Sequence, residues 1–180
     1  MDSRTTPPLL VSSDNVLQTP RWWARRNVYR FENGEERTYF SVVHRPGAVM
    51  VPYDGERFLL VEQYRANIES ISLEFPMGGI EDGEDPETGA KRELMEETGV
   101  EGIRWTSLGK IANANGSLQH WLHLFVVEGL TKTREATPEL DEIGMKSLWA
   151  TKEEIQGWIR SGRIHDGKTL AAWSCYQAQH

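Results

Sequence analysis

The chain has 180 residues, a length that suits one domain better than two. Hydrophobic residues make up 38% and charged residues 26% of it, a mixture that can bury a core and excludes wholesale disorder or a fibrous repeat. Acidic residues outnumber basic residues by 27 to 20, and the formal net charge of −7 argues against binding to nucleic acid. This excess is local, because the window from Glu74 to Glu97 holds nine acidic and two basic residues while the rest of the chain is formally neutral.

Cysteine content and hydropathy bear on the compartment. Cys175 is the only cysteine, so no intramolecular disulfide can form and a reducing, cytoplasmic location is expected. No apolar run is long enough for a signal-peptide core or for the roughly 20 apolar residues of a membrane helix, so no membrane partner is expected. Residues 1–20 are rich in Ser, Thr and Pro. We expect them to form a flexible arm without regular structure, followed by a single domain over residues 21–180.

Two turn signals organise the first half of that domain. Asn33-Gly34 and Asp54-Gly55 are dipeptides that tolerate the positive φ angles of a tight hairpin. The apolar and β-branched runs on either side of them predict four strands, at residues 25–30, 38–44, 48–52 and 58–64.

The second half carries helix signals separated by strand-length apolar runs. Asp85-Pro86-Glu87 places an N-cap acid before a proline, and Gly99 is a natural stop, which predicts a helix from Pro86 to Thr98. Strands are expected at residues 103–111, 120–127 and 143–149. A capping box from Thr151 to Glu154 predicts a helix that runs to about residue 160, and a last helix is expected to start near Asp166. This order of elements predicts a mixed α/β domain.

The predicted acidic helix brings three carboxylates together. Glu93, Glu96 and Glu97 are spaced three and four residues apart, so they project from one face. Like charges at this spacing repel each other, and hard divalent cations such as Mg²⁺ or Mn²⁺ prefer carboxylate oxygens. Considered alone, a pair of glutamates on a helix is usually a solvated charged face.

The surrounding pattern favours a functional interpretation. The segment from Gly78 to Val100 resembles the Nudix box, Gly-x5-Glu-x7-Arg-Glu-U-x-Glu-Glu-x-Gly-U (x any residue, U apolar), at every specified position. The resemblance implies a Nudix-type α/β/α sandwich with a mixed β-sheet and an N-terminal β-hairpin arm. It also implies a metal-dependent hydrolase that cleaves a nucleoside diphosphate linked to another group.

The same resemblance assigns roles by motif position. Metal ligands would come from four residues: the backbone carbonyl of Met77, then Glu93, Glu96 and Glu97, of which Glu97 also counts as a catalytic residue. Arg92 and Glu84 would pair to brace the loop against the helix. The cation would be Mg²⁺, with Mn²⁺ possible, and it would polarise a phosphoryl oxygen and lower the pKa of a bound water.

Outside the box, the chain resembles the ADP-ribose (ADP-sugar) pyrophosphatase branch of the family. The segments that show this resemblance are residues 61–65, 73–79 and 162–172. Arg65 is the candidate for a substrate phosphate contact, and Gly78 is placed in the substrate site. A catalytic base in this branch comes from a loop glutamate, and here Glu139 and Glu142 both remain candidates.

Aromatic residues near the start of the domain extend the resemblance. Trp22, Trp23 and Tyr39 lie where related enzymes stack the adenine, although ordinary packing would also suit them. Residues 21–45 are the expected dimerisation strands of a homodimer.

The expected activity is hydrolysis of ADP-ribose to AMP and ribose 5-phosphate. The stretch from Ile111 to Ser117 lacks the proline of many ADP-ribose pyrophosphatases, which leaves open a broader nucleoside-diphosphate-sugar hydrolase, acting for example on GDP-mannose, or a dinucleotide pyrophosphatase. A remote alternative from another class is a non-catalytic nucleotide-sugar sensing module.

Overall fold

The computed structural model describes residues 6–137 and 144–180. Its chain divides into two compact units, residues 1–45 with 112–121, and residues 46–111 with 122–180. The three segments quoted for the ADP-ribose pyrophosphatase branch all lie in the second unit.

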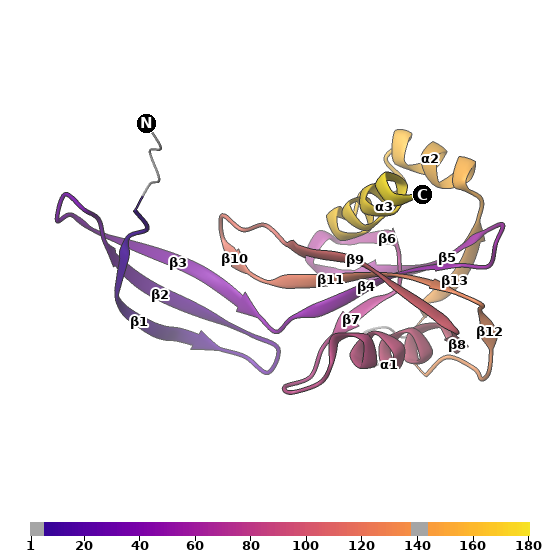
Figure 1. The fold of residues 1–180 in the computed structure, drawn as a ribbon, viewed down its shortest axis with the longest axis horizontal. Helices are drawn as coiled ribbons and strands as arrows, with labels where there is room; N and C mark the ends of the chain where they lie inside the picture. Colours follow the sequence, from indigo (N-terminus) through magenta and orange to yellow (C-terminus); the bar gives the residue numbers. More distant parts are fainter. Residues whose placement is uncertain (1–5, 138–143) are drawn as a thin grey trace. The chain divides into compact units, whose positions relative to one another are not determined.

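The first unit is a sheet with the strand order β1-β2-β3-β10 (Figure 1). Its antiparallel strands are β1 (Leu9–Gln18), β2 (Trp22–Arg30) and β3 (Glu36–His44), and β10 (Leu118–Gln119) runs parallel to β3. The Asn33-Gly34 turn joins β2 to β3, with Gly34 at a φ of 83° as the hairpin signal predicted.

The expectation that residues 1–20 lack regular structure is wrong for Leu9–Gln18. This strand pairs along β2, and its polar side chains have partners there: Arg26 meets Asp14 at 2.9 Å and Ser13 donates to Asn27 at 2.7 Å. The Ser-rich composition suggested a loop, but the cross-strand pairs stabilise a strand.

The second unit is built on a mixed sheet with the order β13-β5-β4-β11-β9, in which β6 also pairs with β5 and β7 with β4. The parallel pair is β4 with β11, whereas β5 runs antiparallel to β4, β6 and β13. The strands are β4 (Gly47–Tyr53), β5 (Phe58–Arg65), β6 (Ser70–Glu74), β7 (Met77–Gly79), β9 (Arg104–Ala112), β11 (Trp121–Glu128) and β13 (Lys146–Ala150). A short 3₁₀ helix, η1 (Ala66–Ile68), joins β5 to β6, and β8 (Val100–Glu101) pairs with β12 (Thr131–Lys132).

The helices are α1 (Pro86–Thr98), α2 (Lys152–Arg160) and α3 (Gly167–Gln179). Their starts agree with the sequence signals, because Asp85 caps α1, the Thr151–Glu154 capping box opens α2, and Asp166 caps α3. Within the described residues, no helix combines the length and apolar character needed to cross a membrane.

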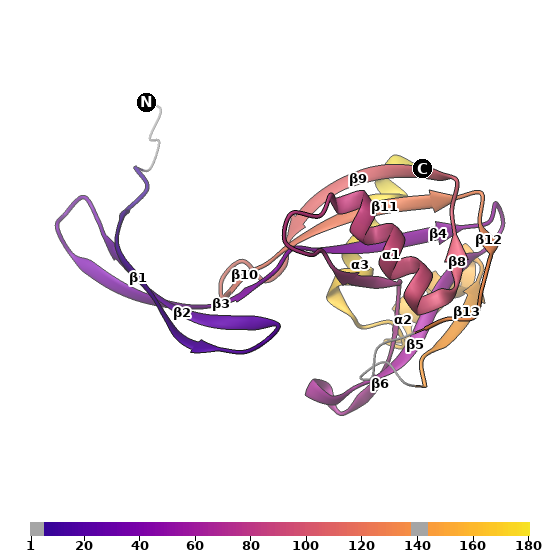
Figure 2. The ribbon, with the colours of Figure 1, turned by 90° about the horizontal axis from the view of Figure 1, so that it is seen from below.

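Alternation along the central strands produces two cores, one on each face of the sheet. Ala48 and Met50 of β4 pack with Ala90 and Leu94 of α1, on the face that α1 covers (Figure 2). The opposite face of β4 contributes Val49 and Val51 to a larger core under α2 and α3.

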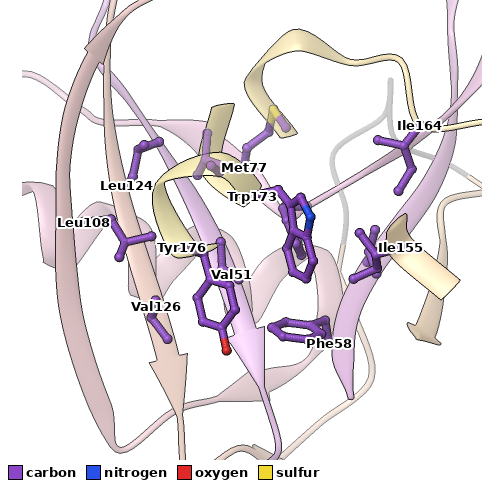
Figure 3. Close-up of a cluster of buried hydrophobic side chains, with 14 of the residues drawn as sticks. Val51, Phe58, Met77, Leu108, Leu124, Val126, Ile155, Ile164, Trp173 and Tyr176 are labelled. Carbon is purple, nitrogen blue, oxygen red and sulfur yellow. The ribbon is translucent and has the colours of Figure 1, made fainter. Parts of the chain in front are cut away.

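Three aromatic rings anchor that larger core (Figure 3). Phe58 makes edge contacts with Trp173 at 5.0 Å and with Tyr176 at 5.2 Å between ring centroids. The second unit is therefore the expected α/β/α sandwich, with α1 on one face of the sheet and α2 and α3 on the other.

Candidate active site

Local sequence fixes both ends of the acidic helix α1. The Asp85 carboxylate accepts the backbone N–H groups of Glu87 and Thr88 at 3.1 Å each, and Pro86 occupies the first turn, where its missing N–H costs nothing. At the other end Gly99 adopts a φ of 69° and donates to Met95 at 2.8 Å. The helix therefore presents its last two turns, which carry the glutamates, in a fixed orientation.

The Glu93 carboxylate lies against the backbone of strand β7 at Gly78. A Cβ atom at Gly78 would overlap that carboxylate, whereas a Cβ at the neighbouring Gly79 would have no atom within 4 Å. Gly78 is thus required for close approach of helix and loop, while its predicted contact with substrate stays a prediction.

Arg92 holds the loop and the helix together. Its guanidinium contacts both carboxylate oxygens of Glu84, at 3.3 and 3.1 Å, and donates to the Gly79 carbonyl at 2.8 Å. The expected contact between Arg92 and Glu84 is therefore present. The same guanidinium also reaches Glu93 at 2.8 Å and Glu96 at 3.2 Å. Hydrogen bonding to Glu84, then to Glu93, raises the pKa of Arg92 above its usual range, and Arg92 in turn lowers the pKa of Glu84.

Glu97 is the buried member of the three helix glutamates. Its side chain is on the inner face of α1, the residue is 3% exposed, and its carboxylate accepts the backbone N–H of Met77 at 3.0 Å. The structure therefore places Glu97 beside the backbone of Met77, through the N–H group of Met77. Whether the Met77 carbonyl binds a metal stays a prediction.

A second charged pair lies on the α1 side of strands β5 and β6. Arg65, at the end of β5, forms a two-point ion pair with Glu74, with one contact of 2.8 Å from the guanidinium Nε. The Glu74 side chain is only 2% exposed and that of Arg65 is 35% exposed. Burial acts to raise the pKa of Glu74, but the hydrogen bond and charge of Arg65, helped by the charge of Lys168, hold it below its usual value.

The aromatic candidates lie in the first unit. Trp22 and Trp23 are consecutive in β2, so their side chains point to opposite faces of that sheet. Tyr39 pairs in register with Asn27 and therefore shares a face with Trp23, but four residues further along the strand, about 13 Å away. No two of the three form a stacking pair within one chain, and their contact with a base stays a prediction. The two base candidates, Glu139 and Glu142, lie outside the described residues.

The three helix glutamates suit a divalent cation by chemistry, although they are turned to protein partners here. Across residues 6–137 and 144–180, no three acidic, His or Cys side chains already converge as a metal cage. Glu93 and Glu96 face Arg92, and Glu97 faces Met77. Their carboxylate oxygens are nevertheless the donors that Mg²⁺ and Mn²⁺ prefer, and the absence of a side chain at Gly78 lets the Glu93 carboxylate lie directly against the backbone that leads to Met77. The donor set therefore fits the cation.

Comparison with known proteins identifies the family to which this site belongs. A family model described as the NUDIX domain matches residues 43–172. The chain belongs to the Nudix family. Its members generally depend on a divalent metal ion, in agreement with the donor set on α1.

The Nudix relatives include enzymes named for ADP-containing substrates. The chain is 34% identical over 135 residues to the ADP-ribose pyrophosphatase of Bacillus subtilis, covering 73% of this chain and 72% of that protein. It is 36% identical over 141 residues to the methanol dehydrogenase activator of Bacillus methanolicus, covering 77% and 76%. Among solved structures, an ADP compounds hydrolase superposes with a TM-score of 0.85 at 20% identity, covering 97% of this chain and 94% of that one, which supports the fold.

Sequence reasoning missed the partner of Arg65 and the residues behind it. Glu74 was part of the charged window and of the family-like segment 73–79, and Thr169 was part of the family-like segment 162–172, but neither was assigned a role. Both are buried polar residues, Glu74 at 1% and Thr169 at 1% exposure. A carboxylate in an otherwise apolar strand run was the available signal for Glu74.

Proposed function

We propose that this Nudix protein hydrolyses the pyrophosphate bond of a nucleoside diphosphate sugar, with ADP-ribose as its best substrate. Water adds to one phosphorus, the bridging P–O bond breaks, and the products are AMP and ribose 5-phosphate. The observation that carries the proposal is the complete box, in which Glu93, Glu96 and Glu97 are all present on α1 and contact Arg92 or the backbone of Met77. The names of the ADP-ribose and ADP-sugar pyrophosphatase relatives support the choice of substrate.

In the proposed reaction, residues of the second unit bind the metal, bind the substrate phosphate and activate the water. Glu93, Glu96 and Glu97, with the Met77 carbonyl, would hold Mg²⁺ or Mn²⁺, which supplies charge neutralisation at the phosphates and an activated water. The Arg65 guanidinium is oriented by its ion pair with Glu74 and would bind a phosphate oxygen of the substrate. Glu142 or Glu139 removes a proton from the attacking water.

The first unit is proposed to form a homodimer with a second copy. Strand β1 is an edge strand, and Leu9 and Leu17 on it are 64% and 54% exposed. Phe40 on β3 is 66% exposed. Exposed apolar side chains on an edge sheet favour association, and light scattering on the purified protein should give twice the chain mass. A monomer mass at micromolar concentration contradicts this assignment.

The single cysteine favours a cytoplasmic location for the proposed enzyme.

The activity is tested with a substrate panel. ADP-ribose, GDP-mannose and a reduced dinucleotide are incubated with the enzyme and Mg²⁺ or Mn²⁺, and kcat/KM is measured by chromatography of the nucleotide products. The highest value for ADP-ribose supports the proposal. A higher value for GDP-mannose or the dinucleotide moves the enzyme to the corresponding alternative, whose relatives include the GDP-mannose pyrophosphatases of Escherichia coli. Binding of ADP-ribose without any hydrolysis indicates a sensing module.

A further inference from the structure

The segment that joins β6 to β7 connects the two halves of the candidate site. Glu74, at its start, holds Arg65, and Met77, at its end, donates to Glu97. Only Phe75 and Pro76 lie between them. The position of this short segment therefore sets the distance between the arginine and the acidic helix.

The backbone of this segment is fixed from three elements. Met77 is tied to α1 through Glu97, and the Pro76 carbonyl accepts the N–H of Met50 in β4 at 2.9 Å. The third tie comes from α3, where the Thr169 hydroxyl accepts the Phe75 N–H at 3.1 Å. Phe75 is fully buried between the ends of the two strands, and Pro76 has no N–H to offer.

Thr169 is itself held by the cap of its own helix. Its hydroxyl donates to the Asp166 carboxylate at 2.9 Å, and its backbone N–H donates to the same oxygen at 2.8 Å. The other Asp166 oxygen lies 3.8 Å from Lys168. The hydroxyl therefore has one defined donor direction and one acceptor direction, so it cannot rotate without losing a bond.

We propose that Thr169, oriented by Asp166, is a positioning residue of the hydrolase: it fixes the peptide between Glu74 and Phe75, so that Arg65 and the Met77–Glu97 contact keep their spacing. Its hydrogen bond to Phe75 joins residues that are 94 positions apart in sequence, and its side chain bonds to Phe75 and Asp166, not to the helix glutamates or Arg65. The inference rests on the proposed function, because the spacing matters only if the arginine and the helix act on one diphosphate.

The test compares Thr169→Val with Thr169→Ser. Valine keeps the branched shape and removes the hydroxyl, whereas serine keeps the hydroxyl. For ADP-ribose with Mg²⁺, Thr169→Val is expected to lower kcat/KM about 10- to 100-fold, with a clear rise in KM, and Thr169→Ser to restore KM to near the wild-type value. A merely structural role would lower the folded fraction, and so the apparent kcat, while KM stays unchanged.

Thr151→Val is the matched control. It removes a threonine hydroxyl at the start of α2 that, like the Thr169 hydroxyl, accepts a backbone N–H, here that of Glu154 at 3.2 Å, and that belongs to no part of the candidate site. This variant is expected to keep the wild-type KM. If Thr169→Val does not fold by circular dichroism, Asp166→Asn replaces it, because Asn still caps α3 but is a weaker acceptor for the hydroxyl. A rise in KM of about threefold is then expected.

The possible results separate the two claims. Wild-type protein that hydrolyses no member of the substrate panel refutes the proposed function, and the positioning role falls with it. Active wild-type protein together with an unchanged KM in the folded variant refutes the positioning role alone. An equally raised KM in Thr169→Val and Thr169→Ser would also refute the positioning role, because serine keeps the hydroxyl and the hydroxyl could then not be the cause.

Discussion

Replacing Glu74 by glutamine probes the buried end of the Arg65 ion pair. The Glu74 side chain is 2% exposed, so its charge is solvated mainly by Arg65. Removing one partner of a fully buried pair costs about 3–5 kcal/mol. Here Arg65 is 35% exposed and can regain water, and glutamine still accepts one hydrogen bond. We therefore expect a loss of about 2 kcal/mol in the free energy of unfolding, or about 4–8 °C in Tm for a chain of this size.

The effect should depend on pH in a direction that follows from the lowered pKa of Glu74. A carboxyl whose pKa is lower in the folded than in the unfolded protein stabilises the fold at pH values above its pKa in the unfolded chain. This stabilisation is lost as the pH falls through its pKa in the folded protein. The usual value is 4.5. The difference in Tm between wild type and Glu74→Gln should therefore be full at pH 6–8 and shrink below about pH 5.

The assay is thermal unfolding by circular dichroism across that pH range, with Glu62→Gln as the control. Glu62 lies on β5, the strand of Arg65, and meets Arg163 at 3.5 Å, but the two side chains of this pair are more exposed, at 34% and 47%. Its replacement should cost less than about 0.5 kcal/mol. Equal Tm values for the two variants at neutral pH would refute the claim that the buried pair stabilises the fold.

Four further substitutions test the acidic helix and the segment packed against it. Glu97→Gln is expected to lower metal-dependent hydrolysis at least about 100-fold with an unchanged circular dichroism spectrum, because the amide oxygen still accepts a backbone N–H; full activity would contradict its role as a ligand. Gly78→Ala is expected to lower kcat/KM about 10- to 100-fold because its Cβ would displace the Glu93 carboxylate. Gly79→Ala, with open space at its Cβ, should stay within about twofold of wild type, and equal losses in both variants would count against steric displacement. Arg92→Lys is expected to lower Tm by about 2–6 °C in a thermal melt, because an ammonium group cannot replace the planar, several-way contact; an unchanged Tm would show that the bracing contacts add no stability.

The elements that the sequence predicted well are those with local causes. The bounds of α1 follow from Asp85 and Gly99, which act on backbone groups within one turn of their own positions. Both hairpin turns were found for the same reason, since the turn dipeptides carry their own conformational preference. The fold class then followed from the order of these elements along the chain.

The features that the sequence did not predict depend on residues that are far apart in the chain. Strand β1 needs its partner β2 to become regular, and its own composition resembles a loop. Arg65 and Glu74 meet only because β5 and β6 pair in a register that puts both on one face. The contact between Thr169 and Phe75 spans 94 residues and depends on how α3 packs, which no local pattern encodes.

The position of Arg92 implies that the acidic helix can fold before any metal binds to it. Three carboxylates on one helix face would repel each other in a metal-free chain, but the guanidinium supplies a cation next to Glu93 and Glu96 from the same helix. In the proposed enzyme, metal entry would then be an exchange of counter-ions at a surface that is already folded, unlike small metal domains that unfold without their ion. A chelator should accordingly abolish turnover while leaving the melting curve nearly in place, and activity should return on adding Mg²⁺ without a refolding step.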